Sequence, residues 1–426
     1  MMSKALSKLK KLKGRSFTEF RVRGAQVIAA AAERYGLSPQ ARVPSDAALC
    51  RSLHLSTAPR GGRGGVGQFG AEQMLEQFRR PTSSNFFASF VAREETLAEL
   101  RGRFGDGDRA LVIERAARIC EGKFDLLGLR ELSFGEPVNW HLEPISGKQT
   151  PLSHWSRIKY LDAAVAGDKK IIWELNRHQY FMTLGRAYWH TGDELFAQTF
   201  VAHINAWMDA NPPKLGINWA SSLEVAFRAI SWLWAIHFFK DAPCLTPEVF
   251  QRALKFLFLH ARHLETYLST YFSPNTHLTG EALGLYYLGT ALPEFRGAAR
   301  WRDTGRRILL AQLERHVRSD GVYFEQSSYY HRYTTDFYTH FYLLAQANGE
   351  HVGDLLEEKL QSLLDHLMYI TRPDGRTPVF GDDDGGRLVM LDERAANDFR
   401  AALSTGAALF GRADYKYVSG GVAAEE

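Results

Sequence analysis

Two stretches of the chain place acid–base and amide side chains where helices are expected to begin. Residues 273–277 read Ser-Pro-Asn-Thr-His and put an amide and an imidazole just before an apolar helical pattern. Residues 320–327 read Asp-Gly-Val-Tyr-Phe-Glu-Gln-Ser and are followed by Tyr329, Tyr330 and His331. The free N–H groups at a helix start favour negative charge. Phenol, imidazole and amide groups together suit the removal of a proton next to a carboxylate.

The same residues also fit purely structural roles. His277 and Glu281 are four residues apart, so on a helix they share one face and the carboxylate can orient the imidazole. They could equally form a buried structural pair. Asn275 could simply cap the helix, and Tyr329 and Tyr330 could be core aromatics. The sequence leaves both interpretations open for each of these residues.

Two further stretches hold more polar and aromatic residues than packing requires. Residues 173–179 read Trp-Glu-Leu-Asn-Arg-His-Gln, and residues 216–219 read Gly-Ile-Asn-Trp and run into Glu224 and Arg228. Each stretch contributes an arginine, the side chain best suited to bidentate recognition of a carboxylate or sulfate. We therefore predict that Arg177 or Arg228 contacts an anionic group of a substrate.

Signatures of metal and nucleophile chemistry are missing. The sequence contains no HExxH or GxSxG motif, and Cys50, Cys120 and Cys244 are too far apart for a CxxC pair. The acidic run 382–384 lacks further ligands at EF-hand spacing, which favours a turn. We predict neither a metal site nor an organic cofactor, although this run leaves a divalent cation open.

The elements that must position these residues are helices. Apolar residues recur at spacings of three and four along most of the chain, whereas strand-like alternation is nearly absent. The expected helices are 97–104, 110–124, 155–166, 179–190, 194–208, 221–239, 246–271, 278–288, 301–317, 333–347 and 355–370. Short connectors force consecutive helices to lie antiparallel. The sequence therefore predicts an all-α array of helical hairpins, and the lack of a strict repeat favours a toroid over a regular solenoid.

The charge is concentrated at the N-terminus. Residues 1–25 hold eight Lys or Arg and one acidic residue, Glu19. The net charge of this segment is therefore larger than the +4 of the whole chain, so the rest of the chain is slightly acidic. This distribution argues against a general nucleic-acid-binding surface. Residues 4–23 include a basic amphipathic pattern, which suits a solvated tail or a weak contact with an anionic membrane surface.

Targeting signals are weak. No apolar run approaches the ~20 residues that span a bilayer, so we predict no integral membrane segment. The apolar stretch 27–32 is short and is followed by Glu33 and Arg34, which does not fit a cleaved secretory signal. The compartment stays open between cytoplasm and periplasm.

Taken in order, the polar stretches resemble the heparinase II/III family of polysaccharide lyases. The matching residues are 176–179, Asn218-Trp219…Glu224…Arg228, Asn275-Thr276-His277…Gly280-Glu281, Asp320-Gly321…Glu325-Gln326-Ser327…Tyr330-His331 and Phe380-Gly381-Asp382…Asp384…Gly386-Arg387. The likeness covers roughly residues 85–390. It rests on the order and spacing of these motifs, since none of them is specific alone.

This resemblance implies an incomplete α/α toroid and cleavage of uronate-containing polysaccharides by β-elimination. Tyr330 occupies the position of the tyrosine that serves as base and acid in the family. Asn275 or His277 matches the residue that neutralises the uronate carboxylate, and we expect His331 to assist Tyr330. The residues expected to bind substrate are Arg177, His178, Asn218, Trp219, Glu224, Arg228, Glu281 and Glu325.

The resemblance also implies a β-sandwich domain after the toroid, from which this sequence departs beyond Arg387. We expect a basic segment and glycine-rich linker over residues 1–84, the toroid over 85–390, and a tail or truncated linker over 391–426. The expected partner is an acidic polysaccharide, with no nucleic acid. Two other functions stay open: a non-catalytic module that binds acidic polysaccharide, and a toroidal glycoside hydrolase, which needs two opposed carboxylates.

Overall fold

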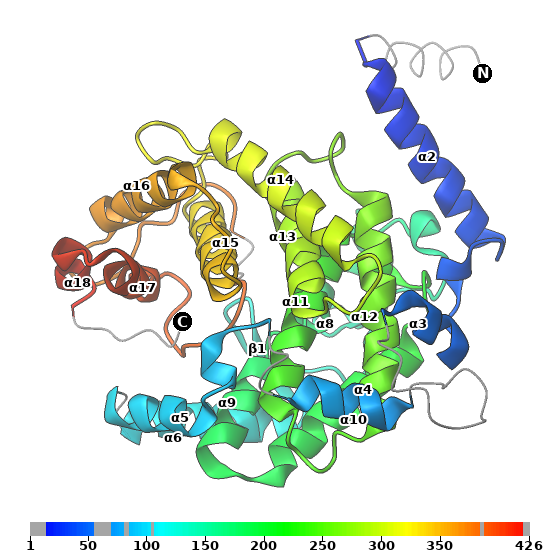
Figure 1. Cartoon of the computed structure of the whole chain (residues 1–426), viewed down its shortest axis with the longest axis horizontal. Coiled ribbons are helices and arrows are strands. Elements are labelled where there is room, and N and C mark those ends of the chain that lie inside the picture. The colour runs from blue at the N-terminus through cyan, green and yellow to red at the C-terminus, as the bar shows by residue number, and fades with distance from the viewer. Residues whose placement is uncertain (1–13, 55–69, 81–84, 104–105, 384–386, 421–426) are drawn as a thin grey trace, which may run out of the picture.

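The structure is a computed structural model that describes residues 14–54, 70–80, 85–103, 106–383 and 387–420 (Figure 1). The basic residues 4–13 and the glycine-rich residues 57–69 lie outside this range. The α-helices are α2 (Phe17–Arg34), α3 (Asp46–Ser52), α4 (Ala71–Arg79), α5 (Arg93–Arg103), α6 (Asp106–Cys120), α7 (Ala163–Ala166), α8 (Lys169–Asn176), α9 (Phe181–Thr191), α10 (Glu194–Ala210), α11 (Ser222–Phe239), α12 (Pro247–Tyr267), α13 (Thr276–Ala291), α14 (Ala298–His316), α15 (Ser328–Ala347), α16 (Asp354–Ile370), α17 (Arg400–Phe410) and α18 (Ala413–Val418). Two small antiparallel hairpins pair β1 (Lys123–Leu126) with β2 (Leu129–Ser133) and β3 (Leu142–Glu143) with β4 (Lys148–Gln149).

Two helices form the centre of the array. Every residue of α11 is buried, and every residue of α13 is buried except His277 in its first turn. A helix that is apolar on all sides has to be surrounded by other elements, and α11 packs on α9, α12 and α13. A Cβ atom at Gly289 or Gly305 would collide with the backbone of the facing helix. These two glycines therefore allow α13 and α14 to pack closely.

Most expected helices are present, and the prediction of an all-α toroid is confirmed. The stretch 155–166 differs, because it forms a single 3₁₀ turn at Trp155–Arg157 and the one-turn helix α7. The Trp155 N–H donates to the carbonyl of Lys214, and Asp162 caps α7 by accepting from the Ala164 N–H. The bond to Lys214 and the cap at Asp162 therefore interrupt the continuous helix that the apolar periodicity predicted.

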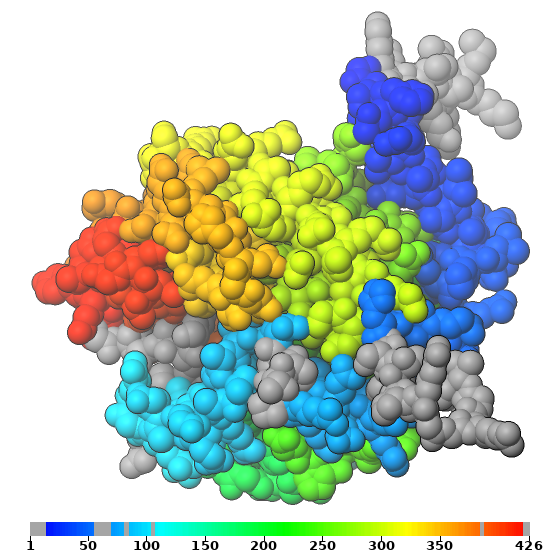
Figure 2. Space-filling view, in the orientation of Figure 1, coloured from blue at the N-terminus to red at the C-terminus, as the bar shows by residue number. Residues whose placement is uncertain are grey.

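Residues on both sides of the expected toroid, 85–390, contribute to its core. Leu49 and Leu75 from the N-terminal region, and Phe399, Leu403 and Tyr415 from the C-terminal region, are buried in the same core as the toroid. Figure 2 shows the C-terminal helices lying against the neighbouring part of the array. Both flanking regions thus bury apolar side chains against the helical body.

Helix α2 extends away from the body at its N-terminal end (Figure 1). Its other end is attached, since Gln26 donates to the Leu268 carbonyl and Glu33 is buried. The described helices include none that is both long and apolar enough to cross a membrane.

Candidate functional site

Glu325 joins the start of α13 to the segment that precedes α15. Its Oε1 accepts from Asn275 Nδ2 at 2.8 Å and its Oε2 accepts from the Thr276 N–H at 3.1 Å. The Thr276 hydroxyl also donates to Glu325 and lies 3.0 Å from the hydroxyl of Tyr323. The two stretches that the sequence singled out first are therefore in direct contact.

Asn275 is the N-cap residue of α13. Its Oδ1 accepts from the His277 N–H at 3.1 Å and lies 3.1 Å from His277 Nδ1. The structural interpretation of Asn275 as a cap is thus confirmed. The amide carries two N–H groups, and the contact with Glu325 uses Nδ2. Asn275 is half-buried and His277 is exposed, so both side chains border solvent at the helix start.

Tyr330 lies in the first turn of α15. The N-cap residue Ser327 accepts from the Tyr330 N–H at 3.2 Å and donates its hydroxyl to the Asp382 carbonyl at 2.6 Å. The Ser328 N–H donates to the Phe380 carbonyl at 3.1 Å. Tyr330 is half-buried, whereas its neighbour Tyr329 is 6% exposed. The segment 380–382 therefore fixes the backbone from which Tyr330 projects.

Glu281 does not orient His277. Both its oxygens accept from Ser269, at 2.7 Å from the backbone N–H and at 2.6 Å from the hydroxyl. Glu281 is buried, which raises its pKa to about 8. Since α13 is surrounded on all sides, residues four apart need not meet the same partner. Glu281 ties the α12–α13 connection to the core.

We expect the Glu281→Gln variant to weaken the pH dependence of stability. The folded carboxyl keeps its proton between its ordinary pKa and about pH 8, whereas the unfolded one loses it, so stability falls as pH rises through this window. Glutamine stays neutral and can still bond to Ser269. Urea unfolding midpoints at pH 5 and pH 8.5 test this, with the exposed Glu76→Gln as control. An unchanged pH slope in Glu281→Gln would contradict it.

Arg177 and Glu224 form a buried bidentate pair. Arg177 Nε and Nη2 donate to the two Glu224 oxygens at 2.6 and 2.9 Å. Its Nη1 donates to Glu174 at 2.7 Å and to the Tyr333 hydroxyl at 2.9 Å. Burial opposes the charge on Arg177, but Glu224, Tyr333 and Glu174 together raise its pKa well above the usual value. This geometry assigns Arg177 and Glu224 to holding α8, α11 and α15 together.

Four other predicted binding residues are fully buried: His178, Asn218, Trp219 and Arg228. His178 accepts from Trp232 Nε1 at 2.8 Å, and Arg228 Nη2 donates to the Asn218 carbonyl at 2.9 Å. Burial lowers the pKa of Arg228 to about 9. A side chain without exposed surface cannot touch a polymer in this conformation, so these four residues are part of the protein core.

His331 faces the interior. Its Nε2 lies 2.9 Å from the Leu363 carbonyl, and its Nδ1 accepts from the Tyr323 N–H at 3.3 Å. Burial lowers its pKa to about 3. His331 is therefore neutral near pH 7 and carries no positive charge to assist Tyr330, contrary to our expectation.

The sequence analysis quoted Thr276 and Ser327 in its motifs but assigned neither a role, and it did not find the basic cavity beside α6. Thr276 binds Glu325, and Ser327 caps α15. A polar residue directly before an apolar helical run is a capping signal, so the role of Ser327 could have been found. In the described part of the chain, no cluster of three or more His, Cys, Asp or Glu side chains could hold a metal ion. Asp384 of the acidic run lies outside the described residues.

The comparison with known families decides the assignment. The family Heparinase II/III N-terminus matches residues 71–402, most of the chain. The chain belongs to the heparinase II/III family.

Curated relatives of this heparinase II/III chain include two heparin-sulfate lyases. The one from Pedobacter heparinus is 27% identical over 289 residues, which is 65% of this chain and 38% of the relative. The one from Bacteroides thetaiotaomicron is 31% identical over 254 residues, 57% of this chain and 35% of the relative.

Solved structures show the same fold. A crystal structure of heparinase III superposes with a TM-score of 0.59 at 23% identity, covering 83% of this chain and 51% of that chain. The heparan sulfate lyase of Pedobacter heparinus superposes with a TM-score of 0.55 at 23% identity, with the same two coverages. The chain thus spans about half the length of these structures and less of the curated relatives.

Proposed function

We propose that this protein is a polysaccharide lyase that cleaves a uronate-containing acidic polysaccharide by β-elimination. The observation that carries the proposal is the contact of Glu325 with Asn275 and Thr276. It brings an amide, an exposed imidazole and the start of the tyrosine-bearing helix α15 to one place. The family membership and the heparin-sulfate lyases among the relatives support the same reaction class.

Asn275 and His277 stabilise the charge that develops on the uronate. Removal of the C5 proton places negative charge on the carboxyl group of the sugar. A well-placed donor in such a site contributes about 3 kcal/mol to the transition state. Glu325 is a positioning residue here: it takes one amide N–H of Asn275, and the second N–H remains for a substrate oxygen. Hydrogen bonds from Asn275 and Thr276 stabilise the Glu325 carboxylate.

Tyr330 moves the proton. Its phenolate oxygen takes the C5 proton, the C4–O4 bond breaks as the C4=C5 double bond forms, and Tyr330 then protonates the departing O4. The positive end of α15 and the fixed backbone at Ser327 favour this role. The reaction consumes no water, oxidant or organic cofactor.

The decisive experiment is incubation of the protein with heparan sulfate, heparosan, alginate and hyaluronan. We expect ultraviolet absorbance to rise together with new reducing ends for at least one polymer, because the product carries a double bond conjugated to its carboxylate. New reducing ends without absorbance would instead show hydrolysis. Binding without product would show a non-catalytic module. Either result would overturn the lyase proposal.

A further inference from the structure

A cavity of about 250 Å³ lies between α6, the β1–β2 hairpin, the start of α9 and the segment 387–396. Six basic side chains line it: Arg115, Arg118, Lys123, Arg130, Arg387 and Arg394. Its acidic lining residues are Asp125, Glu174 and Asp392. Basic side chains therefore outnumber acidic ones among the residues that line the cavity.

Each acidic lining residue is already paired with an arginine. Asp125 accepts from Arg118 at 2.9 Å and Glu174 accepts from Arg177 at 2.7 Å. Asp392 accepts from Arg387; burial would raise the pKa of Asp392, but the Arg387 charge lowers it to about 2. Lys123 pairs with Glu121 at 2.8 Å, outside the lining. The exposed Arg130 makes no ion pair with any of the described residues.

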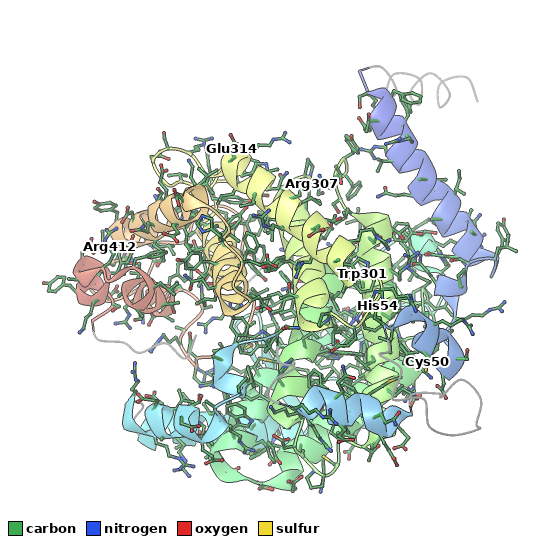
Figure 3. All side chains as sticks on the ribbon, in the orientation of Figure 1. Cys50, His54, Trp301, Arg307, Glu314 and Arg412 are labelled. Carbon is green, nitrogen blue, oxygen red and sulfur yellow. The ribbon has the colours of Figure 1, made fainter. Side chains whose placement is uncertain are left out.

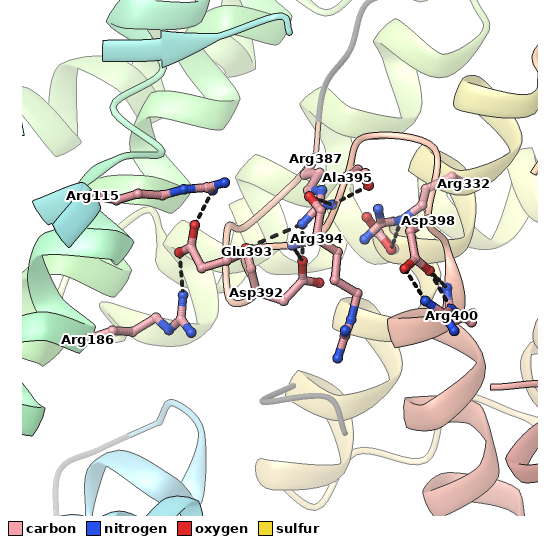
Figure 4. A network of polar contacts seen from close by, with 11 residues as sticks. Arg115, Arg186, Arg332, Arg387, Asp392, Glu393, Arg394, Ala395, Asp398 and Arg400 are labelled. Carbon is pink, nitrogen blue, oxygen red and sulfur yellow. Dashed lines mark hydrogen bonds and ion pairs between the residues drawn. The ribbon is translucent and has the colours of Figure 1, made fainter. Parts of the chain in front are cut away.

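Arg115 contacts a carboxylate that the chain itself supplies. Its Nη1 donates to Glu393, and Glu393 also accepts from Arg186 Nη1 at 2.9 Å (Figure 4). The Glu393 side chain is 7% exposed, and one carboxylate thus serves two guanidinium groups. Arg115 Nε is buried without a hydrogen-bond partner among the described residues. Two guanidinium groups can bind the carboxylate or sulfate of a ligand in the same way.

The cavity adjoins the region of Tyr330. Gln179 Nε2 donates to the Leu388 carbonyl at 3.0 Å, which holds the segment 387–396 against the start of α9. Glu174 lines the cavity and accepts a hydrogen bond from Arg177. Arg177 also donates to the hydroxyl of Tyr333, which lies one helical turn after Tyr329 in α15. Arg387, which lines the cavity, is close enough to Tyr329 to oppose the rise in the pKa of that phenol that burial causes. The cavity therefore lies near the start of α15.

We infer that this cavity binds oxyanion groups, carboxylate or sulfate, of the acidic polysaccharide, and that Glu393 is an internal anion that competes for Arg115. The identity of the ligand as a polysaccharide rests on the proposed function. Arg115 and Arg130 attract the anionic groups, and Glu393 reduces the affinity by neutralising Arg115.

The test measures binding by calorimetry in a Tyr330→Phe background, so that no substrate is consumed. The probes are a heparan sulfate hexasaccharide and a heparosan hexasaccharide, which lacks sulfate. We expect Arg115→Gln to raise Kd about tenfold, since a charged hydrogen bond is lost. Arg130→Gln should raise it by a smaller factor because Arg130 is exposed. Glu393→Gln should lower Kd about threefold, and its amide oxygen can still accept from Arg186.

The opposite signs separate binding from a structural role, because a structural defect would weaken binding in all three variants. Arg412→Gln is the matched control: it removes one positive charge near α18, where Arg412 pairs with Asp365 and Asp414 (Figure 3). Equal losses for both probes identify a carboxylate, and a loss for the sulfated probe alone identifies a sulfate. Kd values in Arg115→Gln and Arg130→Gln that match Arg412→Gln, or no binding of either probe, would overturn the inference. Formation of unsaturated product by the parental protein, measured in a separate assay, tests the lyase proposal.

Discussion

The Tyr330→Phe variant is expected to lose turnover of a uronate polysaccharide by a factor of ~10²–10⁴, the usual contribution of a general acid–base group. Phenylalanine keeps the ring and its packing at the start of α15 and removes the only ionisable atom. Substrate affinity and melting temperature should change little, because Ser327 still caps the helix through the backbone. The unsaturated product, followed by its absorbance, gives the rate.

Tyr329→Phe is the matched control for this variant. Tyr329 is buried and its ring packs 5.7 Å from that of Phe399, so we expect it to keep near-parental turnover. If Tyr330→Phe stayed active and Tyr329→Phe did not, the base would be Tyr329. Full activity in both variants would show that neither tyrosine is the base. His277→Ala, at an exposed position, should reduce turnover by removing charge stabilisation without lowering thermal stability.

Glu33→Gln is expected to lower the free energy of unfolding by about 3–5 kcal/mol, the cost of breaking a buried ion pair. Glu33 Oε1 lies 3.0 Å from Lys214 Nζ, and each side chain is 1% exposed. Trp155 Nε1 also donates to Glu33 at 3.2 Å. Burial lowers the pKa of Lys214 to about 8, and Glu33 opposes this shift. Without Glu33 the ammonium group has no anionic partner at this position, and the C-terminal end of α2 loses one of its contacts with the toroid. Urea unfolding measures the loss.

Two variants control for this result. The double variant Glu33→Gln/Lys214→Met removes both charges and should recover a large part of the stability. Glu99→Gln makes the same chemical change in the exposed pair with Arg103 and should cost less than about 1 kcal/mol. A loss in Glu33→Gln no larger than in Glu99→Gln would show that the pair does not anchor α2.

The two proposed sites make different demands on substrate length. The helix starts around Asn275 and Tyr330 act on one uronate, whereas the basic cavity near Arg115 would hold a group further along the polymer. If both proposals hold, a short oligosaccharide should be bound more weakly than a long one and should lose its dependence on Arg115.

The helices were predictable because their signals are local. Apolar spacing along 194–210 and 222–239 recurs with the helical period, and Asp193 and Asn275 precede their helices as caps. The order of the polar stretches was also enough to identify the family. The contact between Asn275 and Glu325, 50 residues apart, could be anticipated as a shared site but not as a hydrogen bond.

The partners of the buried polar groups were decided by tertiary structure alone. Spacing placed His277 and Glu281 on one helical face, yet Glu281 turns to Ser269, and Arg177 turns to Glu224 and Tyr333. The sequence describes which faces of a helix are polar, but not which of them a neighbouring helix covers. A buried charge must find its partner inside the protein, and that partner comes from whichever element the packing brings within hydrogen-bonding distance.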